Sequence, residues 1–166
     1  MVLFTIVLWL HVFSAIGWLG AAMVLAMVIG PGLQKLTPQS RGEFVVTVVP
    51  RYIRYSLAFA VLTLIFGIIS VAVFTNGDFS MMSPSTTFGA YISAGALLAI
   101  VALVVGLGVA IPSANKMVKI LKSTPAGTGA PPPELKTASD RMRIGSTVSM
   151  ALLVIVTILM VAGATL

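Results

Sequence analysis

Long apolar stretches alternate with short basic segments along the whole chain. The apolar stretches run from Val2 to Ile29, from about Arg51 to Phe74, from about Thr87 to Ile111 and from about Ile144 to Leu166. A helix rises about 1.5 Å per residue, so each stretch can cross the roughly 30 Å hydrocarbon core of a bilayer. The pattern predicts an all-α integral membrane protein, in which one membrane domain, residues 1–166, forms an antiparallel bundle of four transmembrane helices.

The composition favours lipid over water as the solvent of these helices. Of the 166 residues, 58% are hydrophobic and only 8% are charged, and the mean hydropathy is +1.11. Soluble domains carry about three times that share of charged side chains. The chain has no cysteine, which excludes disulfides, thiolate metal sites and a cysteine nucleophile.

All Lys and Arg residues lie in two segments, and this distribution predicts the orientation of the helices. One segment separates the first and second apolar stretches and the other separates the third and fourth, whereas the segment between the second and third carries only Asp78. Cytoplasmic loops are enriched in Lys and Arg, so we expect both termini on the outer side of the cell membrane. Topology and anionic lipids then account for the net charge of +6, and nucleic acid is not expected as a partner.

The first basic segment contains a signal for the start of a helix. Ser40 and Glu43 have the spacing of a capping box, in which a hydroxyl and a carboxylate accept free helix N–H groups. The apolar residues 44–49 that follow are interpreted as a turn of interfacial helix. Pro50 suits the first turn of a new helix and ends what precedes it, so the second transmembrane helix is expected to begin near Arg51.

The second basic segment is expected to lie along the inner headgroups of the membrane. Pro112 is expected to close the third transmembrane helix, and residues 114–121 then alternate lysines with apolar side chains, as in a short interfacial helix. We predict that lipid headgroups are contacted by Lys116, Lys119 and Lys122.

A linker follows at about residues 123–136, rich in Pro, Gly and Ala and without periodicity. Thr137 or Ser139 is expected to cap the fourth helix after it.

His11 is the only histidine of the chain, and it lies about 12 Å along the first helix from Leu3. An ionisable group at depth in a membrane is a functional candidate, because its burial in lipid is costly. Ser14 and Trp18 follow on the same helix face, so the three side chains are expected to form one polar stripe. Two interpretations stay open: His11 is a structural residue hydrogen-bonded to another helix, or it binds a metal or cofactor beside Trp18.

Methionine could complete such a site, because Met and His bind copper(I) and serve as axial haem ligands. Met160 lies about 9 Å from the outer end of its predicted helix, close to the depth of His11, so a His11–Met160 metal site is conceivable. The alternative is ordinary packing, since Met fills gaps between helices. A single His cannot support a bis-histidine haem.

Several function classes are excluded by the residues that the chain lacks. With one His, no Cys and no carboxylate in the predicted spans, neither a catalytic triad nor a zinc site of known spacing is expected, and no phosphate-binding Gly loop is present. The interiors of the predicted spans contain no Asp, Glu, Lys or Arg, which disfavours proton-coupled transport. Small residues, among them Gly17 and Gly20, indicate close helix packing.

Residues 9–20, WLHVFSAIGWLG, resemble the first-helix signature of the copper-resistance D superfamily of small membrane proteins, in which Leu-His precedes small residues, a Trp and a Gly. The resemblance continues through Gly30-Pro31, Arg51 and Arg54, and residues 63–67. It implies a bundle of four or more helices linked to copper uptake or, in a related protoporphyrinogen-oxidase branch, to haem. In that branch a Lys on the third helix accompanies the His, and the predicted third helix here has none.

The resemblance and the lone histidine together favour a non-enzymatic membrane protein in metal or cofactor handling, with copper or haem as the candidate cofactor. The alternative is a structural or accessory subunit of a larger membrane complex, because the chain has Gly-rich helix faces and almost no soluble mass. A haem-dependent oxidoreductase is disfavoured by the scarcity of polar groups. The expected partners are membrane lipids and, for the alternative, other membrane subunits.

Overall fold

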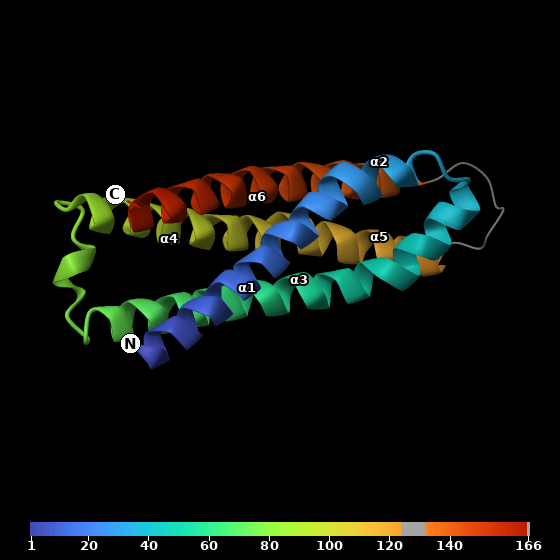
Figure 1. The fold of residues 1–166 in the computed structure, drawn as a ribbon. Helices are drawn as coiled ribbons and strands as arrows, with labels where there is room; N and C mark the ends of the chain where they lie inside the picture. The colour runs from blue at the N-terminus through green and yellow to red at the C-terminus, as the bar shows by residue number, and fades with distance from the viewer. Residues whose placement is uncertain (124–131, 166) are drawn as a thin grey trace.

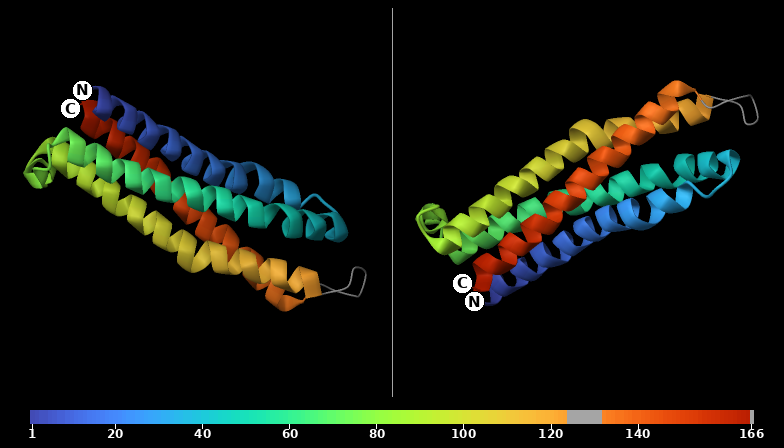
Figure 2. Two further views of the ribbon diagram at one scale, coloured as in Figure 1. Left: turned by 90° about the horizontal axis from the view of Figure 1, so that it is seen from below. Right: turned by 90° about the horizontal axis from the view of Figure 1, so that it is seen from above.

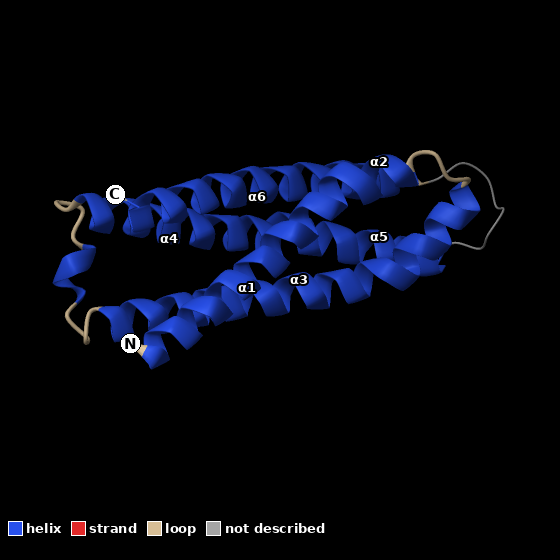
Figure 3. Ribbon diagram, in the orientation of Figure 1, coloured by secondary structure: helices blue, strands red, loops and turns tan. Residues whose placement is uncertain are grey.

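The computed structural model describes residues 1–123 and 132–165, and nearly all of them are helical (Figure 3). In chain order the elements are α1 (Val2–Val24), η1 (Leu25–Ile29), α2 (Gly30–Leu33), α3 (Pro38–Phe74), η2 (Phe79–Met82), α4 (Thr87–Val105), η3 (Gly106–Ala110), α5 (Ile111–Ser123) and α6 (Pro133–Thr165). No strand occurs within these described residues, which confirms the predicted all-α class.

These elements join into four long helices in the described part of the chain. They comprise Val2–Leu33, Pro38–Phe74, Thr87–Ser123 and Pro133–Thr165, and each is long and apolar enough to cross a membrane. The helices run antiparallel, so that both ends of the chain and the connection between α3 and α4 lie at one end of the bundle (Figures 1 and 2). The chain is therefore a multi-pass membrane protein with the predicted four-helix bundle.

The bundle consists of two helical hairpins. α1 packs most closely on α3, and α4 packs most closely on α6, whereas α1 with α6 and α3 with α5 join one hairpin to the other. The central core is made mainly of small side chains, which let helices approach closely: Trp18, Ala22, Ala60, Ala99, Ala102 and Leu153. A second core, at the end that holds the basic residues, contains Val45, Val49, Ala114, Met117 and Ala138.

Two prolines that could end a helix are instead preceded by a π-helical turn. In η1 the N–H of Gly30 donates to the carbonyl of Leu25, and in η3 the N–H of Ile111 donates to that of Gly106, five residues back in both cases. A proline ring collides with the carbonyl four residues before it, and a wider turn moves that carbonyl aside. The first helix therefore continues through Pro31 to Leu33.

The third helix likewise passes Pro112, where we had expected it to end. α5 continues α4 to Ser123 as one long helix instead of lying along the membrane surface (Figure 1). The prediction of a separate interfacial helix at residues 114–121 was therefore wrong, because the π turn lets the helix continue past Pro112.

The second helix also begins earlier than predicted, at Pro38 rather than near Arg51. Its cap is Thr37, whose hydroxyl oxygen accepts the Ser40 N–H at 3.3 Å, so the predicted capping box at Ser40 was wrong. Pro50 lies inside the helix. Next to it, the guanidinium group of Arg51 donates to the carbonyl of Thr47 at 2.8 Å, so a side chain supplies a donor in the turn before the proline.

The fourth helix begins at Pro133, well before the predicted start near Ile144. Proline suits a first helical position because its missing N–H would have no partner there. Thr137 and Ser139, the predicted caps, lie inside this helix, and the Thr137 hydroxyl donates to the carbonyl of Pro133 at 3.3 Å. Of the predicted linker, residues 133–136 are helical and residues 124–131 lie outside the described part.

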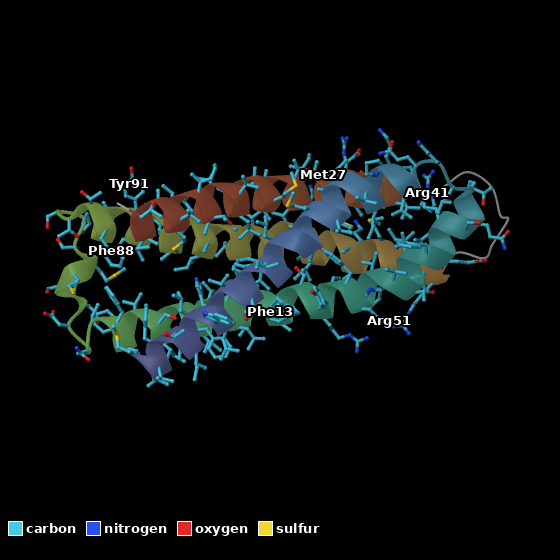
Figure 4. The ribbon with its side chains drawn as sticks, viewed as in Figure 1. Phe13, Met27, Arg41, Arg51, Phe88 and Tyr91 are labelled. Carbon is cyan, nitrogen blue, oxygen red and sulfur yellow. The ribbon has the colours of Figure 1, made fainter. Side chains whose placement is uncertain are left out.

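The connection between α3 and α4 is short and ordered by polar caps. Asn76 and Gly77 have positive φ angles, 50° and 82°, which turn the chain at the end of α3. The carboxylate of Asp78 accepts the N–H of Ser80 at 2.9 Å, and this hydrogen bond lowers the pKa of the exposed Asp78 carboxyl. The basic residues lie at the opposite end of the bundle: Figure 4 shows Arg41 and Arg51 far from Phe88 and Tyr91.

The two glycines predicted to pack closely behave differently. A Cβ atom on Gly17 would overlap the ring of Phe59, whereas one on Gly20 would meet nothing within 4 Å. The Phe59 ring is itself held by Tyr55 and Phe13, with ring centroids 4.5 and 6.1 Å away. Close packing is therefore confirmed at Gly17 and absent at Gly20.

This difference gives a matched pair of variants. Gly17→Leu should destabilise the bundle in detergent by about 1–3 kcal/mol through overpacking against Phe59, and Gly20→Leu should leave the melting temperature nearly unchanged. Thermal unfolding of the purified chain, followed by circular dichroism, measures both. Equal effects of the two variants would contradict the packing of α1 on α3.

Candidate functional site

His11 lies against α3, the partner helix of its own hairpin. Its Nδ1 atom is 2.8 Å from the carbonyl oxygen of Thr63, and the ring is half-buried. A carbonyl oxygen can only accept a hydrogen bond, so Nδ1 must carry the proton that is donated. The hydroxyl of Thr63 donates to the carbonyl of Phe59 at 2.7 Å and leaves the Thr63 carbonyl to the imidazole.

This hydrogen bond fixes the chemistry of the other ring nitrogen. In a neutral imidazole one nitrogen donates and the other accepts, so protonated Nδ1 leaves the lone pair on Nε2. Histidines that bind metals commonly donate their second nitrogen to a backbone carbonyl or a carboxylate in the same way. The predicted hydrogen bond to a neighbouring helix is therefore confirmed, and the arrangement leaves Nε2 free to act as a ligand.

Gly67 makes room for the imidazole ring. A Cβ atom at this position would lie 3.0 Å from Cε1 and 3.1 Å from Nδ1 of His11, which is closer than most real Cβ contacts, so the ring would have to move. Gly67 follows Thr63 by one helical turn, so the carbonyl that accepts the hydrogen bond and the space for the ring lie on one face of α3. Together, Thr63 and Gly67 form a receptor for the His11 side chain.

Ser14 and Trp18, the other members of the predicted polar stripe, point into the bundle but do not bond to His11. Ser14 is 2% exposed, and its hydroxyl donates to the carbonyl of Leu10 in its own helix at 2.7 Å. Trp18 is 6% exposed and belongs to the central core. The stripe is therefore one face of α1 with separate contacts rather than a hydrogen-bonded chain.

Trp18 lines a small cavity in the half of the bundle that holds the basic residues. The cavity has a volume of about 70 Å³, and polar groups are supplied to it by Tyr52, Ser56, Ser146 and Ser149. Two of these hydroxyls already donate to helix carbonyls: Ser146 to Met142 at 2.8 Å and Ser149 to Ala102 at 3.2 Å. Small-molecule pockets are typically about 300–1,000 Å³, so this cavity suits a few water molecules and does not fit a tetrapyrrole.

Met160 packs on α4, in the other hairpin from His11. A Cβ atom at Gly95 would be 2.9 Å from its Cε and 3.5 Å from its Sδ. The closest contacts of His11 are with α3, so the two predicted ligands belong to different helix pairs. A shared site for His11 and Met160 stays a prediction.

The three lysines of α5 lie on the end of a membrane-spanning helix, because α4, η3 and α5 are continuous. The third helix thus does carry Lys residues, contrary to its predicted extent. Lys116 lies 21 residues beyond Gly95, which is about 30 Å along a helix. It therefore does not supply a lysine at the depth of Met160, and the contact of these lysines with headgroups stays a prediction.

Sequence reasoning missed the role of α3 in holding His11. Residues 63–67 were noted for their resemblance to a family, and Gly67 is also one of the small residues that indicate close packing. The useful signal was a Thr followed four residues later by a Gly on the helix next to His11. Ser70 lies three residues further on and is another of these small residues. It is 6% exposed, and its hydroxyl is the one buried side-chain polar atom without a partner in the described residues.

A metal cluster of the common kind is absent from the described residues: no group of three or more His, Asp or Glu side chains could hold an ion there. Comparisons with family models, with curated proteins and with solved structures found no match to this chain. The residues around His11 are therefore the basis on which a function can be proposed.

The single histidine makes the hydrogen bond to Thr63 directly measurable. In protein labelled with ¹⁵N-histidine, NMR should show one ring that carries a proton on Nδ1. Gly67→Ala should shift this signal, because the added methyl group displaces the ring from the Thr63 carbonyl. Gly20→Ala, on an open part of α1, is the control, and a ring protonated on Nε2 in the wild type would refute the arrangement.

Proposed function

We propose that this chain is a non-enzymatic membrane protein of copper-resistance D-like type that handles a metal ion or cofactor through His11. The observation that carries the proposal is the hydrogen bond from Nδ1 of His11 to the Thr63 carbonyl at 2.8 Å. It orients the ring and leaves the Nε2 lone pair available. An ionisable side chain within a membrane span is costly, which favours a functional role for it.

Copper(I) fits these residues better than haem does. It accepts imidazole nitrogen and thioether sulfur in sites of low coordination number, so one His and one Met can supply two of its ligands. Met160 packs beside Gly95 of α4, and its long unbranched side chain is flexible. The proposal requires this side chain to turn away from α4 so that its sulfur can reach a metal ion held by His11.

The metal content of the gently purified protein tests the proposal. We expect copper by elemental analysis, or an absorbance band if the ligand is haem, in the wild type. His11→Ala should abolish the signal while the protein stays inserted, and Met160→Leu should weaken it by removing the thioether. His11→Gln is the control for a structural role, because it keeps a hydrogen-bond donor. A metal-free, colourless wild type would refute the ligand role.

A second candidate function is that of an accessory subunit in a larger membrane complex. One face of α1 favours it: Trp9, Phe13 and Ile16 are largely exposed, and Gly20, on the same face, has open space around it. Glycine on an exposed helix face permits close approach of another transmembrane helix. Gly20→Leu should then break comigration with partner subunits from native membranes without destabilising the isolated chain, whereas a purely metal-handling protein would be indifferent to it.

We further propose that both termini lie on the outer side of the cell membrane, because the basic residues gather at the opposite end of the bundle. The chain has no cysteine, so one introduced cysteine reports one position. A membrane-impermeant maleimide should label Ser80→Cys in intact cells and should label Ser123→Cys only after permeabilisation. The reverse pattern would invert the topology.

A further inference from the structure

A cavity of about 330 Å³ lies between α5 and α6, near the end of the bundle that holds the basic residues. Its polar lining consists of Ser113 and Lys116 from α5 and Thr137 and Arg141 from α6. The buried Ala138 also lines it. Two helices thus contribute one cation each to the same space.

The cavity exists because of the π turn in front of Pro112. Gly108 and Val109, both in η3, form its apolar side together with Pro112. A Cβ atom on Gly108 would meet nothing within 4 Å. The wide turn and the missing side chain therefore leave a hollow where a regular helix with a larger residue would fill the space.

Of the four polar side chains that line the cavity, only that of Thr137 has a hydrogen bond or ion pair in the described residues. In the described residues the only ion pair joins Asp140 and Arg143 at 3.9 Å, so neither Lys116 nor Arg141 has a carboxylate partner there. Ser113 is 8% exposed, and no hydrogen bond of its hydroxyl is found among these residues. Two cations without a carboxylate partner in these residues, together with a hydroxyl that makes no hydrogen bond there, favour an anion as the occupant of the cavity.

The place of the apolar residues relative to the two cations indicates which kind of anion the cavity binds. Val109 precedes Lys116 by seven residues, or about 10 Å of helix, and it lies on the membrane side of the cations. A phospholipid has the same order of chemistry along the membrane normal, with apolar chains below a phosphate. Free phosphate would use only the cationic half of the cavity.

We propose that this cavity binds one anionic phospholipid, with its phosphate between Lys116, Arg141 and Ser113 and its glycerol end beside Gly108 and Val109. The Thr137 hydroxyl is already used by Pro133 and is not needed as a donor. The site is distinct from His11 and does not depend on the proposed metal function. It also differs from general attraction of headgroups to the α5 lysines, because Lys119 and Lys122 do not line the cavity.

Ligand choice is tested with the purified full chain in an uncharged detergent. Phosphatidylglycerol, phosphatidylcholine and inorganic phosphate are added separately, and native mass spectrometry counts the bound molecules. One phosphatidylglycerol should bind per chain, about tenfold or more tightly than either of the other two, because it alone supplies both a net negative charge and an apolar end. Equal binding of inorganic phosphate would reduce the site to an anion site and overturn the proposal.

Two double variants that remove the same charge test the location. Lys116→Gln with Arg141→Gln should lower the affinity for phosphatidylglycerol by about tenfold or more relative to Lys119→Gln with Lys122→Gln, since charge-assisted hydrogen bonds are lost only in the first. Equal losses would mean unspecific surface attraction and would overturn the proposal.

A third variant tests the apolar side while keeping every charge. Gly108→Leu places a side chain in the hollow and should abolish binding of phosphatidylglycerol, with unchanged helix content by circular dichroism. Should Gly108→Leu bind this lipid as the wild type does, the glycerol end cannot lie beside η3, and the proposal fails.

Discussion

In the hydrocarbon core of a membrane, every backbone N–H and C=O group must find its partner within the protein, and this requirement governs the whole bundle. It explains the nearly complete helicity and the short connection between α3 and α4. It also explains how the prolines are accommodated. Pro31 and Pro112 follow π turns in which an i to i−5 hydrogen bond replaces the regular one, and Pro50 lies where arginine side chains donate to nearby helix carbonyls. Local departures from the α-helix thus preserve continuity of the spans.

The same requirement limits which side chains are free for chemistry. Several hydroxyls in the described spans donate to a carbonyl of their own helix, as Ser14, Thr63 and Ser146 do, and such groups have no donor left for a ligand. His11 differs because its ring is too far from its own backbone and bonds across to α3. One ring nitrogen, Nδ1, then makes the hydrogen bond between the two helices, and the other, Nε2, makes none in the described residues. A histidine in lipid can therefore be both a structural residue and a ligand, and the two interpretations drawn from the sequence do not exclude each other.

The sequence predicted the number of spans, the helical class and the clustering of the basic residues, since all three follow from the spacing of charged and apolar residues. It failed at helix boundaries. Pro50 and Pro112 were read as breaks, but a proline's effect depends on whether the preceding turn can widen or nearby side chains can donate, and neither is visible in a local pattern. At the candidate site, the depth of His11 and the burial of Trp18 were predictable from helical spacing. The Thr63 carbonyl and the gap at Gly67 were not, because they depend on how α1 rotates against α3.

The two hairpins share the same spacing between a π turn, a proline and a lysine. Each π turn ends two residues before a proline, and a lysine follows that proline by four residues, Lys35 in the first hairpin and Lys116 in the second. Lys116 lies one helical turn beyond its proline on the same helix face, whereas Lys35 lies in the turn that follows α2. Only the second π turn contains glycines, Gly106 and Gly108, and these line the cavities on its two sides. The first contains Leu25, which is buried, and Met27, which is largely exposed. Because side-chain volume at a widened turn decides how much of the gap the protein itself fills, the glycines of η3 leave the space that the proposed lipid occupies.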